Sequence, residues 1–144
     1  MPYDIIFDED SNVPLQDEIK SIISKVLDYL DYRTRDICVS VSFTTPEEIR
    51  QLNSNYRNVD KPTNVLSFPN TGNVLGDIVL CLDIVKKEAT EQQKTYEDHL
   101  THLIVHSILH LLGYDHVSDE EAEEMEQKEI DILKTVFKIE NPYI

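Results

Sequence analysis

Positive charge is scarce in this sequence. The 144 residues contain 13 lysines and arginines against 28 aspartates and glutamates, which gives a net charge of −15 at pH 7. Nonspecific binding of a polyanion depends on many basic contacts, so a broad nucleic-acid surface is excluded. A polyanionic ligand would need a local basic pocket, helped by a bound metal ion. The acidic residues between 119 and 131 are expected to form a mostly solvated helix face.

Cysteines and long apolar runs are also few. Cys38 and Cys81 each lie in a strand-like run, and the sequence has no C-x-x-C motif. We therefore expect reduced core thiols in a cytoplasmic protein. No segment approaches the ~20 apolar residues of a membrane span, and the acidic N-terminus lacks the apolar region of a signal peptide. These absences predict a single cytoplasmic domain over residues 1–144, with no membrane partner.

Hydrophobic periodicity and turn residues predict elements in the order βαβαββααα. Thr45 and Ser118 have the type and spacing of helix N-caps with a glutamate three residues later, and Asp83 is expected to cap a third helix. The order predicts an α+β, or mixed α/β, fold in which about five helices cover a four-stranded mixed sheet. The expected strands cover residues 3–7, 37–43, 65–68 and 77–82, and the expected helices cover 15–31, 46–55, 84–94, 96–112 and 119–136.

Three histidines fall within the stretch His-Ser-Ile-Leu-His-Leu-Leu-Gly-Tyr-Asp-His, which begins at His106. His106 and His110 are four residues apart, which places both rings on one face of a helix. Gly113 can adopt the left-handed conformation that ends a helix, so His116 can turn back toward them. Three neutral imidazoles that converge form a metal site with a fourth position open to water. The central helix and its following turn therefore predict one Zn²⁺ per chain and a metal-dependent hydrolase.

The alternative is that these histidines are hydrogen-bonded core residues, since apolar residues surround them. Three histidines at ligand spacing, with a glycine at the turn, favour the metal site instead. His99 and His102 lie upstream on the same expected helix. We expect them on the helix surface or behind the ligands.

The histidine spacing resembles the zinc-protease pattern H-E-x-x-H-x-x-G-x-x-H. Ser107 stands where that pattern has the glutamate that acts as general base. A serine at its ordinary pKa cannot replace this carboxylate. Peptide hydrolysis by this route is therefore disfavoured, while other hydrolysis remains open.

A polar segment precedes the third expected strand. Residues 52–69 read Leu-Asn-Ser-Asn-Tyr-Arg-Asn-Val-Asp-Lys-Pro-Thr-Asn-Val-Leu-Ser-Phe-Pro, which is typical of a functional loop between a helix and a strand. Arg57 is the candidate for binding an anion, because a guanidinium matches a phosphate bidentately. The alternative is a structural ion pair between Arg57 and Asp60, and the sequence by itself favours neither.

Two motifs together closely resemble the YbeY family. They are N-x-x-Y-R-x-x-D-x-P-T-x-V-L-S-F-P at residues 53–69 and H-x-x-x-H-L-x-G-Y-D-H at residues 106–116. Leu75-Gly76-Asp77-Ile78 is similar to the family's strand that leads to the site. The resemblance covers most of the chain and departs at Ser107, where the family usually has glycine.

The resemblance implies a function and its residues. Members of this family are bacterial single-strand-specific endoribonucleases, which act in maturing the 3′ end of 16S ribosomal RNA and in ribosome quality control. The resemblance implies zinc ligands at His106, His110 and His116, with Arg57 as a further catalytic residue beside the zinc. The expected partners are single-stranded RNA, ribosomal RNA and the small ribosomal subunit, and no DNA is expected. Asp115 lies near a ligand, but the general base is not assigned.

Two other functions are compatible with the sequence. A zinc metallopeptidase-like hydrolase is supported by the histidine spacing and weakened by Ser107. A non-catalytic, ribosome-associated zinc protein would be favoured by a fourth protein ligand to the metal. The sequence shows three firm ligands.

Overall fold

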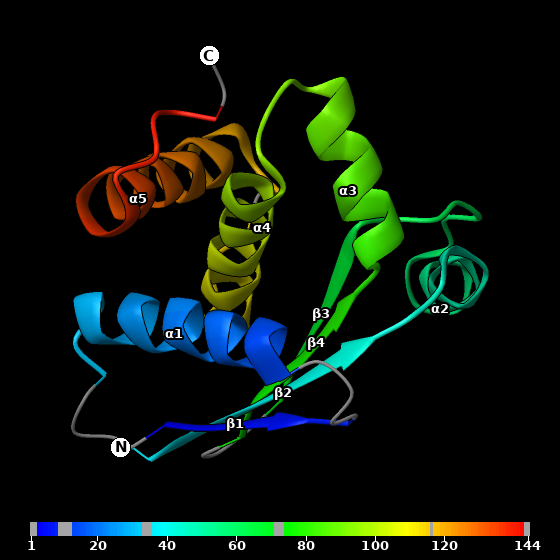
Figure 1. Ribbon diagram of the computed structural model, residues 1–144, viewed down its shortest axis with the longest axis horizontal. Helices are drawn as coiled ribbons and strands as arrows, with labels where there is room; N and C mark the ends of the chain where they lie inside the picture. The colour runs from blue at the N-terminus through cyan, green and yellow to red at the C-terminus, as the bar shows by residue number, and fades with distance from the viewer. Residues whose placement is uncertain (1–2, 9–12, 33–35, 71–73, 116, 143–144) are drawn as a thin grey trace.

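The computed structural model describes residues 3–8, 13–32, 36–70, 74–115 and 117–142. Their elements follow the predicted order βαβαββααα (Figure 1), which confirms it. The strands are β1 (Tyr3–Phe7), β2 (Ile37–Phe43), β3 (Val65–Pro69) and β4 (Val74–Leu80), and the helices are α1 (Val13–Tyr29), α2 (Pro46–Arg57), α3 (Leu82–Glu91), α4 (Tyr96–Leu111) and α5 (Asp119–Phe137).

The strands form one mixed sheet in the order β1-β2-β4-β3. β1 pairs with β2, and β2 with β4, in parallel, whereas β3 and β4 are antiparallel. Helices connect the parallel neighbours, while a short connection is sufficient for the antiparallel pair. The predicted four-stranded mixed sheet is confirmed, and β3 is an edge strand.

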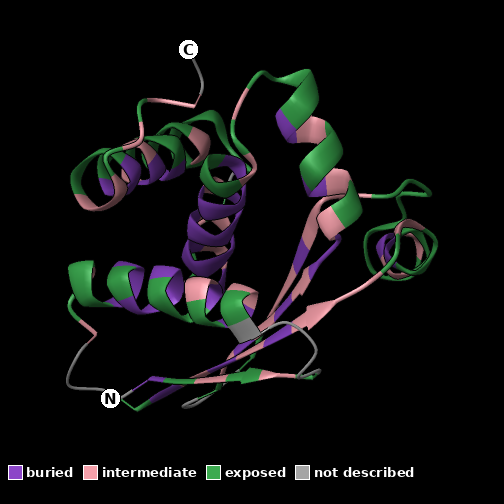
Figure 2. Ribbon diagram, viewed as in Figure 1, coloured by how far each residue is buried: buried purple, intermediate pink, exposed green. Residues whose placement is uncertain are grey.

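Helices cover both faces of the sheet. On one face, α4 is buried along most of its length between the sheet, α1 and α5 (Figure 2). Ile78 and Leu80 of β4 belong to this larger core, whereas Val79 points to the other face because strand side chains alternate. There Val79 packs with Ile49 of α2 and Leu66 of β3. The larger core holds α4 firmly, so its remaining face can present side chains at fixed positions.

β4 begins at Val74, earlier than the predicted start at residue 77. Gly76 interrupts the apolar pattern without ending the strand. It has φ +154°, and the pairing with β2 shifts register beside it, between Cys38 and Val39. A Cβ at Gly76 would lie 2.4 Å from the carbonyl oxygen of Phe68, so only glycine allows β3 this close.

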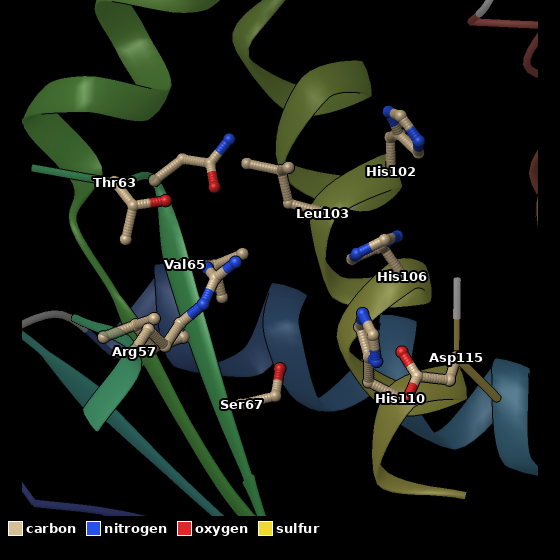
Figure 3. A pocket seen from close by; sticks show the side chains of 11 residues that line it. Arg57, Thr63, Val65, Ser67, His102, Leu103, His106, His110 and Asp115 are labelled. Atoms are coloured by element: carbon tan, nitrogen blue, oxygen red, sulfur yellow. The ribbon is translucent and has the colours of Figure 1, made fainter. Parts of the chain in front are cut away.

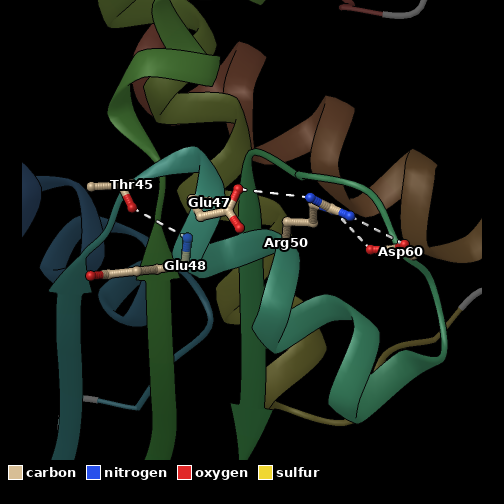
Figure 4. Close-up of polar contacts among 5 residues, drawn as sticks. All are labelled: Thr45, Glu47, Glu48, Arg50 and Asp60. Carbon is tan, nitrogen blue, oxygen red and sulfur yellow. Dashed lines mark hydrogen bonds and ion pairs between the residues drawn. The ribbon is translucent and has the colours of Figure 1, made fainter.

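Two of the three predicted helix caps are correct. Thr45 Oγ1 accepts a hydrogen bond from the Glu48 N–H at 3.2 Å (Figure 4), and Ser118 Oγ accepts one from the Glu121 N–H at 3.2 Å. The carboxylate of Glu48 accepts from the Thr44 hydroxyl at 2.7 Å. Both caps satisfy N–H groups that have no partner inside the helix.

The predicted cap of α3 is wrong. Cys81 occupies the N-cap position, without a side-chain hydrogen bond, and Asp83 lies inside the first turn. A carboxylate in the first turn still interacts favourably with the positive end of the helix. The apolar Leu82 begins the helix because the chain turns directly from β4 into the core.

Cys38 is half-buried and Cys81 is buried, and both are free thiols. Burial is the main cause that raises the pKa of each thiol above its ordinary value. Both observations agree with the expected reduced core thiols. Separately, within the described ranges no helix has the length and apolarity needed to cross a membrane.

Candidate active site

A pocket of about 410 Å³ lies between α4 and the edge strand β3 (Figure 3). One wall comes from α4 and the turn after it: His102, Leu103, His106, His110 and Asp115. The other wall comes from the end of α2, the following loop and β3: Arg57, Thr63, Asn64, Val65, Leu66 and Ser67. The pocket thus brings the two polar sequence segments together, although they lie far apart in the chain.

His106 and His110 project from one face of α4 into this pocket (Figure 3). Their ring centroids are 4.6 Å apart and their planes are inclined by 80°. The opposite face of α4 is apolar, with Ile104 and Ile108 fully buried in the core. Core packing therefore sets the rotation of the helix and directs both imidazoles outward.

α4 ends in the turn that the sequence predicts at Gly113. Gly113 has φ +103°, a conformation that side chains with a Cβ rarely adopt. Its N–H donates to the His110 carbonyl, and the Tyr114 N–H donates to the Leu109 carbonyl, each at 3.0 Å. This pair of hydrogen bonds is a Schellman motif, which reverses the chain after the second histidine.

The third predicted ligand, His116, lies outside the described residues. Within the described ranges, no three or more histidine, cysteine, aspartate or glutamate side chains are grouped to hold a metal ion. The three-histidine site therefore stays a prediction, with two of its members placed in the pocket.

A buried carboxylate stands behind the first histidine. Glu129 of α5 is fully buried, and its Oε1 lies 2.8 Å from Nδ1 of His106 and 3.4 Å from Nε2 of His102. The acidic residues between 119 and 131 are exposed, as predicted, except for Glu129. Its helical spacing from Met125 and Ile132, both buried, places it on the apolar face and could have identified it.

This contact decides which nitrogen of His106 serves the pocket. A carboxylate accepts hydrogen bonds only, so a neutral His106 must carry its proton on Nδ1. Its lone pair then lies on Nε2, which is the arrangement of a metal-binding histidine with a carboxylate behind it. The donor chemistry of His106 and His110 therefore fits a zinc ion.

His99 and His102 differ from each other. His99 is only 3% exposed, and its Nε2 lies 3.0 Å from Oε1 of Glu88 on α3. His102 lines the pocket beside Leu103 and also approaches Glu129. His99 is thus a core residue rather than a surface residue, whereas His102 lines the pocket and shares Glu129 with His106.

The structure pairs Asp60 with Arg50 instead of Arg57. Nε of Arg50 donates to Asp60 Oδ1 at 2.8 Å, and Glu47 lies on the other side of the guanidinium (Figure 4). The hydrogen bond from Arg50 lowers the pKa of Asp60 below its ordinary value. Arg57 is the last residue of α2, is exposed and reaches into the pocket, opposite the histidines (Figure 3).

Two further side chains bear on the chemistry. Ser107 is fully buried and donates its hydroxyl hydrogen bond to the Leu103 carbonyl at 2.8 Å, so it faces the core. It therefore offers neither a base nor a nucleophile to the pocket. Asp115 is exposed and lines the pocket near His110 (Figure 3).

The family model and the relatives that match this chain carry the same name. The family model described as Endoribonuclease YbeY matches residues 5–137. A protein named Endoribonuclease YbeY from Idiomarina loihiensis is 45% identical over 139 residues, which is 92% of this chain and 85% of the relative. One from Francisella philomiragia is 41% identical over 150 residues, which is 97% of this chain and 93% of the relative.

A solved structure is also similar. The solution structure of TM1509 from Thermotoga maritima aligns with a TM-score of 0.59 and 28% identity, and the alignment covers 94% of this chain and 92% of that one. The family model, the relatives and the fold agree with the two motifs, and the chain belongs to the YbeY endoribonuclease family.

Proposed function

We propose that this protein is a zinc-dependent, single-strand-specific endoribonuclease that acts in maturing the 3′ end of 16S ribosomal RNA and in ribosome quality control. Family membership supports the endoribonuclease activity. The zinc ion, the preference for single strands and the ribosomal role are parts of the proposal that go beyond family membership. The two free thiols support a cytoplasmic site of action.

One observation carries the proposal: Arg57 faces His106 and His110 across a single pocket. A phosphodiester needs a cation that recognises its oxygens and a group that activates the attacking oxygen. A guanidinium opposite two imidazoles brings both requirements to one place. The chain has a net charge of −15, so a polyanion must be held by a local cationic site of this kind.

Each residue of the pocket has a separate role in the proposed reaction. His106, His110 and His116 would hold the zinc ion, which when bound lowers the pKa of a water ligand and polarises a phosphoryl oxygen. Glu129 holds the proton of His106 on Nδ1 and keeps that ring facing the pocket. Arg57 binds the phosphate and stabilises the negative charge that develops on it during cleavage.

The pocket also supports a single-stranded substrate. It is concave and lies between a helix and an edge strand, where a strand with unpaired bases can enter. Sequence-specific recognition of RNA mostly uses such unpaired segments, because side chains cannot read the bases in the deep, narrow major groove of the A-form duplex. Ribosomal RNA on the small subunit is the proposed substrate.

The alternatives gain no support from the pocket. A metallopeptidase of the pattern discussed above would need a carboxylate at position 107, where the buried Ser107 faces the core. A purely structural zinc would need a closed site, whereas His106 and His110 face a pocket of about 410 Å³. Incubating one metal-loaded sample with single-stranded RNA, duplex RNA and casein separates the candidates.

Replacing Arg57 tests the proposal directly. Arg57→Glu should lower RNA cleavage by ~10²-fold or more, as when a group that stabilises transition-state charge is removed. Zinc content and melting temperature should change little, because Arg57 is exposed and no ion pair with a described residue is seen for it. Arg57→Lys should restore part of the activity, since lysine keeps the charge but loses the bidentate geometry.

The matched control is Arg50→Glu, on the same helix but paired with Asp60 outside the pocket. It should cleave RNA like the wild type. Wild-type cleavage by Arg57→Glu would show that the phosphate is bound elsewhere. Unfolding of Arg57→Glu would show that the arginine is structural.

A further inference from the structure

Asn64 lies on the pocket wall that faces the histidines. It is the last residue of the loop before β3, and its carbonyl accepts a hydrogen bond from the Cys81 N–H at 2.9 Å. This contact continues the antiparallel pairing of β3 and β4 by one residue. The backbone of Asn64 is therefore held by the sheet, which fixes where its side chain begins.

The Asn64 side chain is held as well. Its Nδ2 donates to Oε1 of Glu88 at 2.8 Å, and the same oxygen lies 3.0 Å from Nε2 of His99. Glu88 comes from α3 and His99 from α4, and His99 is 3% exposed. Because a carboxylate only accepts hydrogen bonds, the amide nitrogen must face Glu88 and the amide oxygen must occupy the opposite corner.

The amide oxygen of Asn64 remains available to a ligand. No described residue donates a hydrogen bond to Asn64 Oδ1, and this oxygen is not fully enclosed by the protein. Since Asn64 lines the pocket, a bound molecule can reach this oxygen. Oδ1 can only accept a hydrogen bond, whereas the hydroxyls of Thr63 and Ser67 on the same wall can both donate and accept.

An acceptor at this place distinguishes RNA from DNA. The sugar-phosphate backbone of DNA carries acceptor oxygens but no hydrogen-bond donor. RNA carries one donor in each nucleotide, the 2′-hydroxyl, and this group lets a protein recognise RNA. Arg57 in the same pocket supplies the donors that phosphate oxygens need, so an acceptor beside it would serve the neighbouring ribose.

We propose that Asn64 is a specificity-determining residue, whose Oδ1 accepts a hydrogen bond from a ribose 2′-hydroxyl next to the phosphate bound by Arg57. Glu88 and His99 are positioning residues, which act by orienting the amide. This inference rests on the proposed ribonuclease function. It names the contact by which the pocket selects RNA over DNA.

The test uses single-stranded RNA oligonucleotides in which one nucleotide at a time carries 2′-fluorine. The fluorine preserves the RNA-like sugar conformation but cannot donate a hydrogen bond. We expect kcat/KM of the zinc-loaded wild type to fall about fivefold at one position near the cleaved bond, the effect of one lost hydrogen bond. Asn64→Ala should cleave the unmodified RNA more slowly and show no further loss at that position.

Matched variants separate recognition from structure. Asn55→Ala removes an exposed asparagine outside the pocket and should keep the wild-type pattern of 2′-fluoro effects. Glu88→Ala leaves Asn64 in place but frees its amide, so the loss at the sensitive position should shrink. This variant reports on the same contact if Asn64→Ala does not fold, which a melting curve would reveal.

The outcomes are distinct. An equal 2′-fluoro loss in the wild type, Asn64→Ala and Glu88→Ala, or no loss anywhere in the wild type, overturns the role of Asn64 and leaves the ribonuclease function standing. A position where fluorine abolishes cleavage in every protein identifies a reacting hydroxyl and does not count as recognition. If the zinc-loaded wild type cleaves no RNA, the proposed function fails, and this inference fails with it.

Discussion

Two histidine–glutamate contacts on α4 have opposite exposure. In the pair His99–Glu88, the histidine side chain is 4% exposed and the carboxylate 31%. In the pair His106–Glu129, the histidine is 28% exposed and the carboxylate 1%. The distances are similar, at 3.0 and 2.8 Å, although His99 uses Nε2 and His106 uses Nδ1. The difference lies in which partner the core encloses.

In each pair the enclosed partner holds the more exposed one in place. Glu129 is locked in the core and orients His106 toward the pocket. His99 is locked in the core and holds Glu88, which in turn holds Asn64 on the opposite wall. Both sides of the pocket are thus braced from the interior, which is how a site keeps its geometry without a ligand.

Exchanging the two histidines for alanine should give crossed results, the largest effects expected here. His99→Ala removes a buried side chain and should lower the free energy of unfolding by roughly 2–4 kcal/mol, as for other large core truncations. His106→Ala should cost less stability and lose zinc binding. Denaturant unfolding of the metal-free proteins and metal analysis after purification without chelator give both quantities. Zinc retained by His106→Ala would break the comparison.

The carboxylates should differ in the same way. Glu129→Gln keeps the shape but removes the charge behind His106, so zinc affinity should fall about 10- to 100-fold. Glu88→Gln, which is not in contact with His106 or His110 in the described structure, should change zinc affinity less than twofold. Competition with a chromophoric chelator measures both. Equal losses in the two variants would show that the effect is general destabilisation.

Gly113→Val tests whether the turn after α4 is needed for zinc binding. A Cβ at Gly113 meets no atom within 4 Å, so the cost of Gly113→Val comes from its φ of +103°. We expect a loss of stability of roughly 1–2 kcal/mol or more. Zinc affinity should fall more than helix content, because His116 follows the turn. Full affinity would show that the turn is dispensable. Circular dichroism and zinc titration report the two effects.

A solvent-exposed pair, Arg50–Asp60, should give the smallest effect. Arg50 lowers the folded-state pKa of Asp60, so the pair stabilises the fold above the unfolded-state pKa of about 4 and loses this contribution as pH falls through the folded value. Arg50→Ala should therefore melt slightly below wild type at pH 7, with the gap closing in acid. A gap that widens in acid would contradict the sign. Added salt should reduce it as well.

Local patterns were readable without the structure. The order of elements, the caps at Thr45 and Ser118, and the positive φ of Gly113 follow from periodicity and from residue types that act within a few residues. His106 and His110 on one helix face follow from the same period. The start of β4 and the cap of α3 were misjudged, since Gly76 and Leu82 take their conformations from neighbouring strands and the core.

The amino-acid sequence by itself determined the family motifs, the elements and the pairing of His106 with His110, because these depend on spacing along one helix. Only the tertiary structure decided the partners. Asp60 pairs with Arg50, Arg57 lines the pocket, and Glu129 contacts His106. Such choices join residues on different elements. They depend on how the helices pack and on which side chain the core encloses. Spacing along the sequence does not reveal which residues of different elements come into contact.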